Sequence, residues 1–161
     1  MKNCEVYQGQ NPPFLKCYSL GSTGGNINST DVGKFVTKSS NHYGLAVGSS
    51  SYQNIVGYVA AVSGSGVVSS TNPFYVAPFK DGNTYAVKYS TLYSANHPTS
   101  TSIGMYVGLS TAATIAGAVI SMASEAKVYS STGASAPIFR INGYSTAQRR
   151  LFVEAYKGVE L

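Results

Sequence analysis

Few residues of this 161-residue chain could do acid–base, nucleophilic or metal chemistry. They are two histidines, two cysteines and six carboxylates: His42, His97, Cys4, Cys17, Glu5, Asp31, Asp81, Glu125, Glu154 and Glu160. Catalysis needs such groups held beside one another, and these are scattered along the chain. Serine is abundant, but no Gly-x-Ser-x-Gly sequence marks a nucleophile. The sequence therefore predicts no catalytic residue and a protein that is not an enzyme.

No spacing typical of a metal or cofactor site occurs. The sequence has no His-x-x-x-His, no Cys-x-x-Cys and no Asp-rich calcium loop. The glycine-rich stretches 21–25 and 64–66 lack the Lys-Ser/Thr that follows a phosphate-binding loop. We expect no cofactor and no metal.

The two cysteines, Cys4 and Cys17, both lie near the N-terminus. They could be reduced thiols, a disulfide or a metal-binding pair. Residues 1–18 contain charges and a Pro-Pro pair instead of the apolar core of an export signal. This favours two reduced thiols, because disulfides persist mainly in oxidising compartments.

The charge pattern argues against nucleic acid as a partner. The net charge is +5, but charged residues make up only 11% of the chain, against roughly a quarter in an average soluble domain. The lysines are dispersed, whereas binding to phosphates needs several cations on one face. The adjacent pair Arg149 and Arg150 is better explained as the start of a strand or as part of a protein interface.

The uncharged, apolar stretch 103–123 raises the question of a membrane span. A spanning helix needs about 20 predominantly apolar residues. Serine, threonine and glycine interrupt this stretch, and no basic cluster flanks it. We expect buried strands here and no membrane association.

Short apolar runs bounded by Gly, Ser, Asn and Pro recur at intervals of about ten residues, which is typical of an antiparallel all-β domain. An Asp-Gly pair, Asp81-Gly82, between two of these runs predicts a β-hairpin. The expected strands are 33–37, 43–47, 54–62, 67–68, 74–79, 84–90, 103–109, 126–129, 137–141 and 150–156.

The ends of this pattern define the predicted organisation. Residues 1–30 form an extended N-terminal arm that could lie along a neighbouring subunit, and residues 31–161 form the β-domain. Residues 111–127 combine good helix formers with strand formers, so a helix or a strand is open there. We predict an antiparallel β-sandwich or small β-barrel, with room for one short helix.

Tyrosine is the most informative residue type, with 13 in the chain and no tryptophan. Tyrosine offers a large apolar area with a hydroxyl that prefers a wet edge, which suits protein contact surfaces. Strand propensity alone would also enrich it. The candidate interface residues are Val6, Tyr7, Phe14, Leu15, Tyr18, Arg149 and Arg150.

Five segments give the chain its resemblance to a known group: 33–36, 44–48, 55–59, 84–88, and 140–144 continuing through 151–153. In these the sequence reads Gly-Lys-Phe-Val, Gly-Leu-Ala-Val-Gly, Ile-Val-Gly-Tyr-Val, Thr-Tyr-Ala-Val-Lys, and Arg-Ile-Asn-Gly-Tyr with a closing Leu-Phe-Val. The chain resembles the small all-β decoration, or cement, proteins of tailed bacteriophage heads over roughly residues 31–156. That group contributes no catalytic residues.

The resemblance implies a virion structural protein on the capsid exterior, made in the host cytoplasm. Its partner would be the major capsid protein, whose neighbouring subunits it would tie together as a homo-oligomer, with a trimer favoured. An alternative is another virion or surface β-module: a head-fibre base, a tail component or a glycan-binding adhesin. For an adhesin, the candidate cluster is 93–97, where tyrosine, asparagine and histidine meet.

Overall fold

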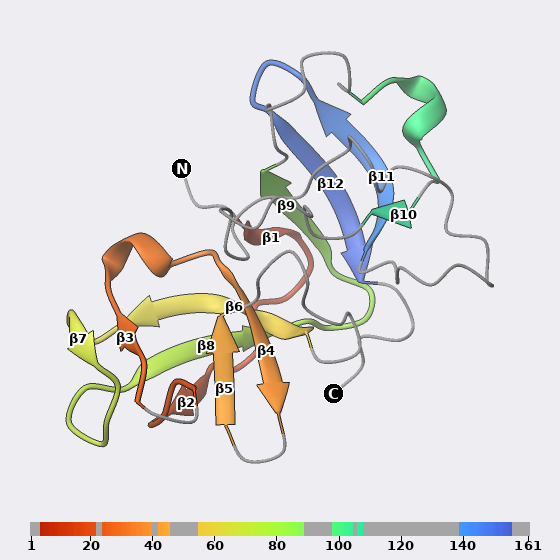
Figure 1. Ribbon diagram of the computed structural model, residues 1–161. Helices are drawn as coiled ribbons and strands as arrows, with labels where there is room; N and C mark the ends of the chain where they lie inside the picture. The colour runs from red at the N-terminus through yellow and green to blue at the C-terminus, as the bar shows by residue number, and fades with distance from the viewer. Residues whose placement is uncertain are drawn as a thin grey trace.

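A computed structural model describes residues 4–21, 24–39, 42–45, 55–88, 98–104, 106–107 and 139–155. These residues form antiparallel β-sheets with two short 3-10 helices, which confirms the predicted all-β class (Figure 1). The expected strand at 126–129, the ambiguous segment 111–127 and the cluster 93–97 lie outside the described residues.

The first sheet has five strands in an order that mixes the two ends of the chain. From one edge to the other they are β1 (Cys4–Gln8), β9 (Thr84–Lys88), β12 (Arg150–Ala155), β11 (Phe139–Ser145) and β10 (Tyr106–Val107). Strands β11 and β12 form a hairpin, and its loop ends at Arg149, which has a left-handed backbone with φ of 54°. A 3-10 helix, η4 (Ser100–Ser102), precedes β10.

The second sheet is curled. Its order is β2 (Leu15–Cys17), β8 (Phe74–Pro78), β6 (Ile55–Val62), β4 (Phe35–Ser39) and β5 (His42–Leu45). Just after β2, Leu20 pairs with Tyr43 of β5, so the two edges of this sheet approach each other as in a half-closed barrel. A small third sheet, β3 (Asn26–Ile27) with β7 (Gly66–Val67), and the 3-10 helix η1 (Ser29–Asp31) complete this half (Figure 1).

Two hydrophobic cores hold these layers. The first, which we call the inter-sheet core, takes buried residues from both five-stranded sheets: Cys4, Phe35, Ile55, Tyr58, Ala77, Phe79, Tyr85, Val87, Phe139, Ile141, Leu151 and Val153. The second, the barrel core, lies on the other face of the curled sheet and contains Cys17, Leu20, Ile27, Val36, Val56, Val59, Val68, Phe74 and Val76. Strand β6 supplies residues to both cores, which explains its run of five buried residues instead of a strict alternation.

The Asp81-Gly82 hairpin prediction is wrong, although a turn forms there. The amide of Asn83 donates to the carbonyl of Lys80 at 3.3 Å, and Gly82 has φ of +80°. However, β8 belongs to the curled sheet and β9 to the first sheet. The turn therefore carries the chain from one layer to the other, since turn chemistry specifies a reversal of direction and not the sheet that the next strand joins.

The N-terminal segment is extended, as expected, but it lies within the chain's own sheets. Strand β1 pairs with β9, and β2 pairs with β8. Cys4 and Cys17 are almost fully buried, one in each core. The boundary predicted between an arm at 1–30 and a β-domain at 31–161 therefore coincides with no boundary in either sheet.

Candidate interaction surface

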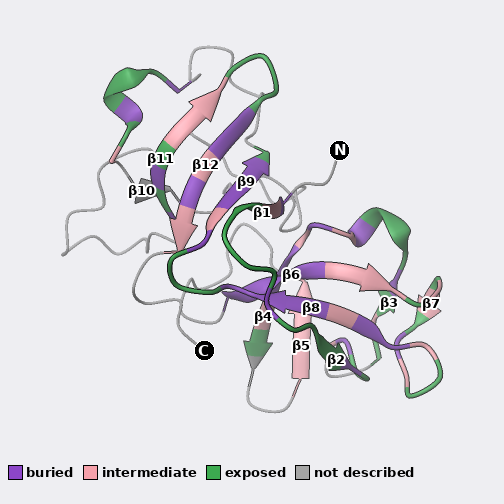
Figure 2. Ribbon diagram, turned by 180° about the vertical axis from the view of Figure 1, so that it is seen from behind, coloured by how far each residue is buried: buried purple, intermediate pink, exposed green. Residues whose placement is uncertain are grey.

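The N-terminal segment supplies an edge strand to each five-stranded sheet, β1 to one and β2 to the other. Four large apolar side chains on or beside these strands are exposed: Tyr7 at 62%, Phe14 at 52%, Leu15 at 37% and Tyr18 at 53%. We call these four residues the N-terminal edge. Figure 2 shows an exposed stretch of chain running from β1 to β2 between the two sheets.

Local contacts hold two of these aromatic rings in place. The ring of Tyr7 lies against Phe152 of β12, with centroids 4.3 Å apart. The ammonium of Lys16 lies 5.5 Å from the ring centroid of Tyr18, within cation–π range. Each ring therefore keeps a preferred position while most of its surface faces solvent, which reduces the entropy lost on binding.

The connection between β1 and β2 is fixed by one buried amide side chain. Asn83 donates from Nδ2 to the carbonyl of Gln10 at 2.8 Å and accepts the Gln10 amide at Oδ1 at 3.2 Å. Gly9 has φ of +120°, and a Cβ there would overlap the Asn83 side chain. The hydroxyl of Tyr85 accepts the Lys80 amide at 2.7 Å in the same cluster. The two places where the chain crosses between sheets are thus joined to each other.

The other predicted interface residues lie elsewhere. Val6 is half-buried against the inter-sheet core. Arg150 begins β12, as expected for a strand start, but it is only 3% exposed; its Nη1 is 3.1 Å from Glu5 Oε1 and donates to the Ala86 carbonyl at 3.2 Å. Arg149 is exposed in the β11–β12 loop. Of the predicted interface residues, Tyr7, Phe14, Leu15, Tyr18 and Arg149 are therefore exposed, whereas Arg150 is buried in an ion pair.

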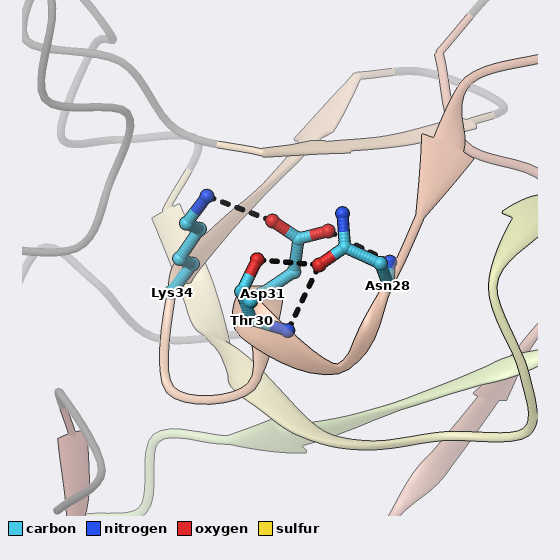
Figure 3. Close-up of polar contacts among 4 residues, drawn as sticks. All are labelled: Asn28, Thr30, Asp31 and Lys34. Atoms are coloured by element: carbon cyan, nitrogen blue, oxygen red, sulfur yellow. Dashed lines mark hydrogen bonds and ion pairs between the residues drawn. The ribbon is translucent and has the colours of Figure 1, made fainter.

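A polar cluster that the sequence reasoning missed surrounds η1 (Figure 3). Asn28 caps the helix by accepting the Thr30 amide at 2.8 Å, while Asp31 accepts the Asn28 amide at 2.9 Å. The ammonium of Lys34 pairs with the buried Asp31 carboxylate at 2.7 Å. The signal was present as an Asn followed three residues later by an Asp, a variant of the capping box. These groups satisfy one another, so the cluster is structural.

The titratable groups within the described ranges include two buried cysteines and no metal-binding cluster. No group of three or more His, Cys, Asp and Glu side chains among them could hold a metal ion. His42 is half-buried in β5, and His97 is outside the described residues. Both cysteines are free thiols, and burial raises the pKa of Cys17 to about 11 and that of Cys4 well above its usual value. Protonated thiols are poor nucleophiles and poor metal ligands.

Two further observations complete the description. Of the helices in the described part of the chain, none has the length and apolar character needed to cross a membrane. Searches with the chain find no matching family model, no matching curated protein and no matching solved structure.

Proposed function

We propose that this protein is a virion structural protein that binds an assembled capsid lattice and stabilises the shell by bridging neighbouring subunits. It does so without catalysis, on the capsid exterior and as a homo-oligomer, with a trimer favoured. The observation that carries the proposal is the N-terminal edge, where exposed apolar side chains accompany the edge strands of both sheets. The choice of a capsid as partner rests on the resemblance to phage decoration proteins.

The chemistry of the N-terminal edge suits a protein partner. An edge strand offers unpaired backbone groups to which a neighbouring polypeptide can add a strand. Exposed tyrosine and phenylalanine rings are enriched where proteins meet. The four side chains are uncharged, so binding through them is expected to depend little on salt.

On a lattice, each individual contact can have a low affinity. A decoration protein meets many equivalent sites on a shell, and an oligomer that engages several subunits gains from effective concentration without any new contact. A short edge strand with a few anchoring side chains would bind one capsid subunit weakly. Several such contacts made at once by an oligomer would hold the protein on the shell.

Co-sedimentation with empty shells, assembled from the major capsid protein of the same source, tests the proposal. A Leu15→Ala/Tyr18→Ala double variant is expected to bind shells at least about tenfold more weakly than the wild type, because it removes two anchors from the N-terminal edge. Both side chains are exposed, so the free energy of unfolding should change little.

The control is Val67→Ala, which truncates an apolar side chain on β7 of the third sheet that is at least as exposed as Leu15 and Tyr18. It should bind shells like the wild type. Wild-type protein that fails to sediment with shells would refute the capsid assignment. Equal losses in the control and the double variant would remove the N-terminal edge as the binding surface.

A further inference from the structure

A pocket opens between β1 and β6, with a volume of about 240 Å³. Strand β1, the β1–β2 connection and β6 each contribute two residues to its wall: Glu5, Val6, Asn11, Phe14, Tyr58 and Ala60. This volume is many times the roughly 10–15 Å³ that one buried water needs. That is room for one small cyclic molecule, and not for a peptide segment.

One buried side chain in the wall, Tyr58, carries a hydrogen-bond donor. Tyr58 is 6% exposed and hydrogen-bonds with the backbone of Val6. Burial raises the pKa of Tyr58 well above its usual value. The phenol therefore stays neutral and keeps a proton that it can donate to a ligand oxygen.

The rest of the wall is close to neutral but rich in hydrogen-bonding groups. The carboxylate of Glu5 is compensated by Arg150, whose Nη1 lies 3.1 Å from it. The exposed Asn11 side chain can donate through its amide group and accept through its carbonyl. A site with both donors and acceptors and little net charge favours a neutral polar ligand over an ion.

Apolar groups line the remainder of the pocket. Val6 and Ala60 present aliphatic surface, and Phe14 presents an aromatic ring that is half exposed. A ligand that fits must therefore combine hydroxyl groups on its rim with apolar C–H surface on its faces. A sugar ring has this combination, since its hydroxyls point outward and its axial hydrogens lie on the faces.

We propose that the pocket between β1 and β6 binds a neutral, hydroxylated ligand of the size of one sugar ring, either a free monosaccharide or the terminal residue of a glycan. Tyr58 and Asn11 provide hydrogen bonds to the ligand hydroxyls, and Phe14 packs against its C–H face. This activity is additional to shell binding and does not need Leu15 or Tyr18, although Phe14 belongs both to the pocket wall and to the N-terminal edge.

Saturation-transfer NMR tests the proposal with the methyl glycosides of glucose, galactose, mannose and N-acetylglucosamine as probes. We expect at least one glycoside to receive saturation from the wild-type protein. Tyr58→Phe, which keeps the ring and removes the hydroxyl, and Asn11→Ala should each weaken that binding about tenfold. Asn11→Ala changes an exposed side chain, so it remains informative even if Tyr58→Phe is less stable.

The control is Tyr18→Ala, which should bind the glycoside like the wild type because Tyr18 does not line the pocket. A disaccharide ending in the preferred sugar separates the two ligand sources: equal affinity identifies a glycan terminus, and loss of affinity identifies a free monosaccharide. Methylguanidinium and acetate serve as small charged competitors, one cationic and one anionic.

Three results would overturn the inference. They are saturation of none of the four glycosides, binding that is unchanged in both pocket variants, and displacement of the sugar signal by a charged probe that binds better. The shell-binding experiment gives a separate outcome, because its variant changes Leu15 and Tyr18, and neither of them lines the pocket. Tyr58→Phe should still sediment with shells, and the Leu15→Ala/Tyr18→Ala variant should still bind the glycoside.

Discussion

The two cores of this protein are filled by different kinds of side chain, because the spaces between their strands differ. The inter-sheet core contains five aromatic residues, among them Phe79 and Phe139, whose rings meet edge to face with centroids 5.0 Å apart. The barrel core contains one buried aromatic ring, Phe74, and five valines. Facing sheets stand about 10 Å apart, so long side chains are needed to fill the space. A sheet that curls towards itself is filled by short, branched ones.

The N-terminal segment contributes buried residues to both cores. Its two cysteines are 13 positions apart, with Cys4 in the inter-sheet core and Cys17 in the barrel core. Small buried thiols behave as compact apolar groups. The comparison teaches that this segment joins two cores of different composition, and three experiments can test that view.

The largest effect is expected from deleting residues 1–20. The deletion removes Cys4, Cys17 and Leu20 from the cores and leaves β8 and β9 with unpaired edges. The truncated chain should lose its cooperative thermal transition, measured by circular dichroism, because both cores become open to water. A synthetic peptide of residues 1–20 added in trans should restore part of the transition. A truncated chain that unfolds cooperatively near the wild-type temperature would show that the cores do not depend on the segment.

A smaller effect distinguishes the cores from each other. Phe139→Ala in the inter-sheet core should lower the free energy of unfolding by about 3–5 kcal/mol, because it removes ring contacts with both Phe35 and Phe79. Val76→Ala in the barrel core removes two methyl groups and should cost about 2 kcal/mol. Urea unfolding measures both values. Val67→Ala, on the surface, should stay within about 0.5 kcal/mol of the wild type, and equal costs at positions 139 and 76 would contradict the contrast.

The smallest effect is a pH dependence from the barrel core. Burial raises the pKa of Cys17 from 9.0 to about 11, so the folded state holds the proton more tightly than the unfolded state. The contribution of this pKa difference to the free energy of unfolding is fully present below about pH 9 and is lost as the pH rises to about 11. Wild-type protein should therefore lose about 1–2 kcal/mol more than Cys17→Ala over that interval. If the free energy of unfolding falls equally with pH in the two proteins, Cys17 does not cause the loss of stability at high pH.

Much of the fold could be predicted from local patterns. The strands predicted from the apolar runs at 33–37, 54–62, 74–79, 84–90 and 150–156 correspond to β4, β6, β8, β9 and β12, with ends that differ by at most two residues. These runs carry their signal in many residues, so one misplaced side chain does not hide it. The short strands β1 and β2 were harder to identify because only one residue in each is fully buried.

These local patterns do not specify which strands pair when the partners are far apart in the sequence. The Asp81-Gly82 turn looks the same whether the next strand returns to the same sheet or crosses to another. The difference depends on partners far away in the sequence, such as Gln10, which lies 73 positions from Asn83. The burial of Arg150 likewise depends on Glu5 and on the Ala86 carbonyl, which no local window includes.

The pairing of β1 and β2 with strands far along the chain has a consequence for folding during translation. Strands β1 and β2 have their partners in β9 and β8, so β2 cannot complete its pairing until residue 78 has been synthesised, and β1 cannot until residue 88 has been. Contacts of such long sequence separation form late and slowly. During translation β1 and β2 therefore remain unpaired, exposed to chaperones and to the strands of neighbouring nascent chains, until β8 and β9 have been synthesised.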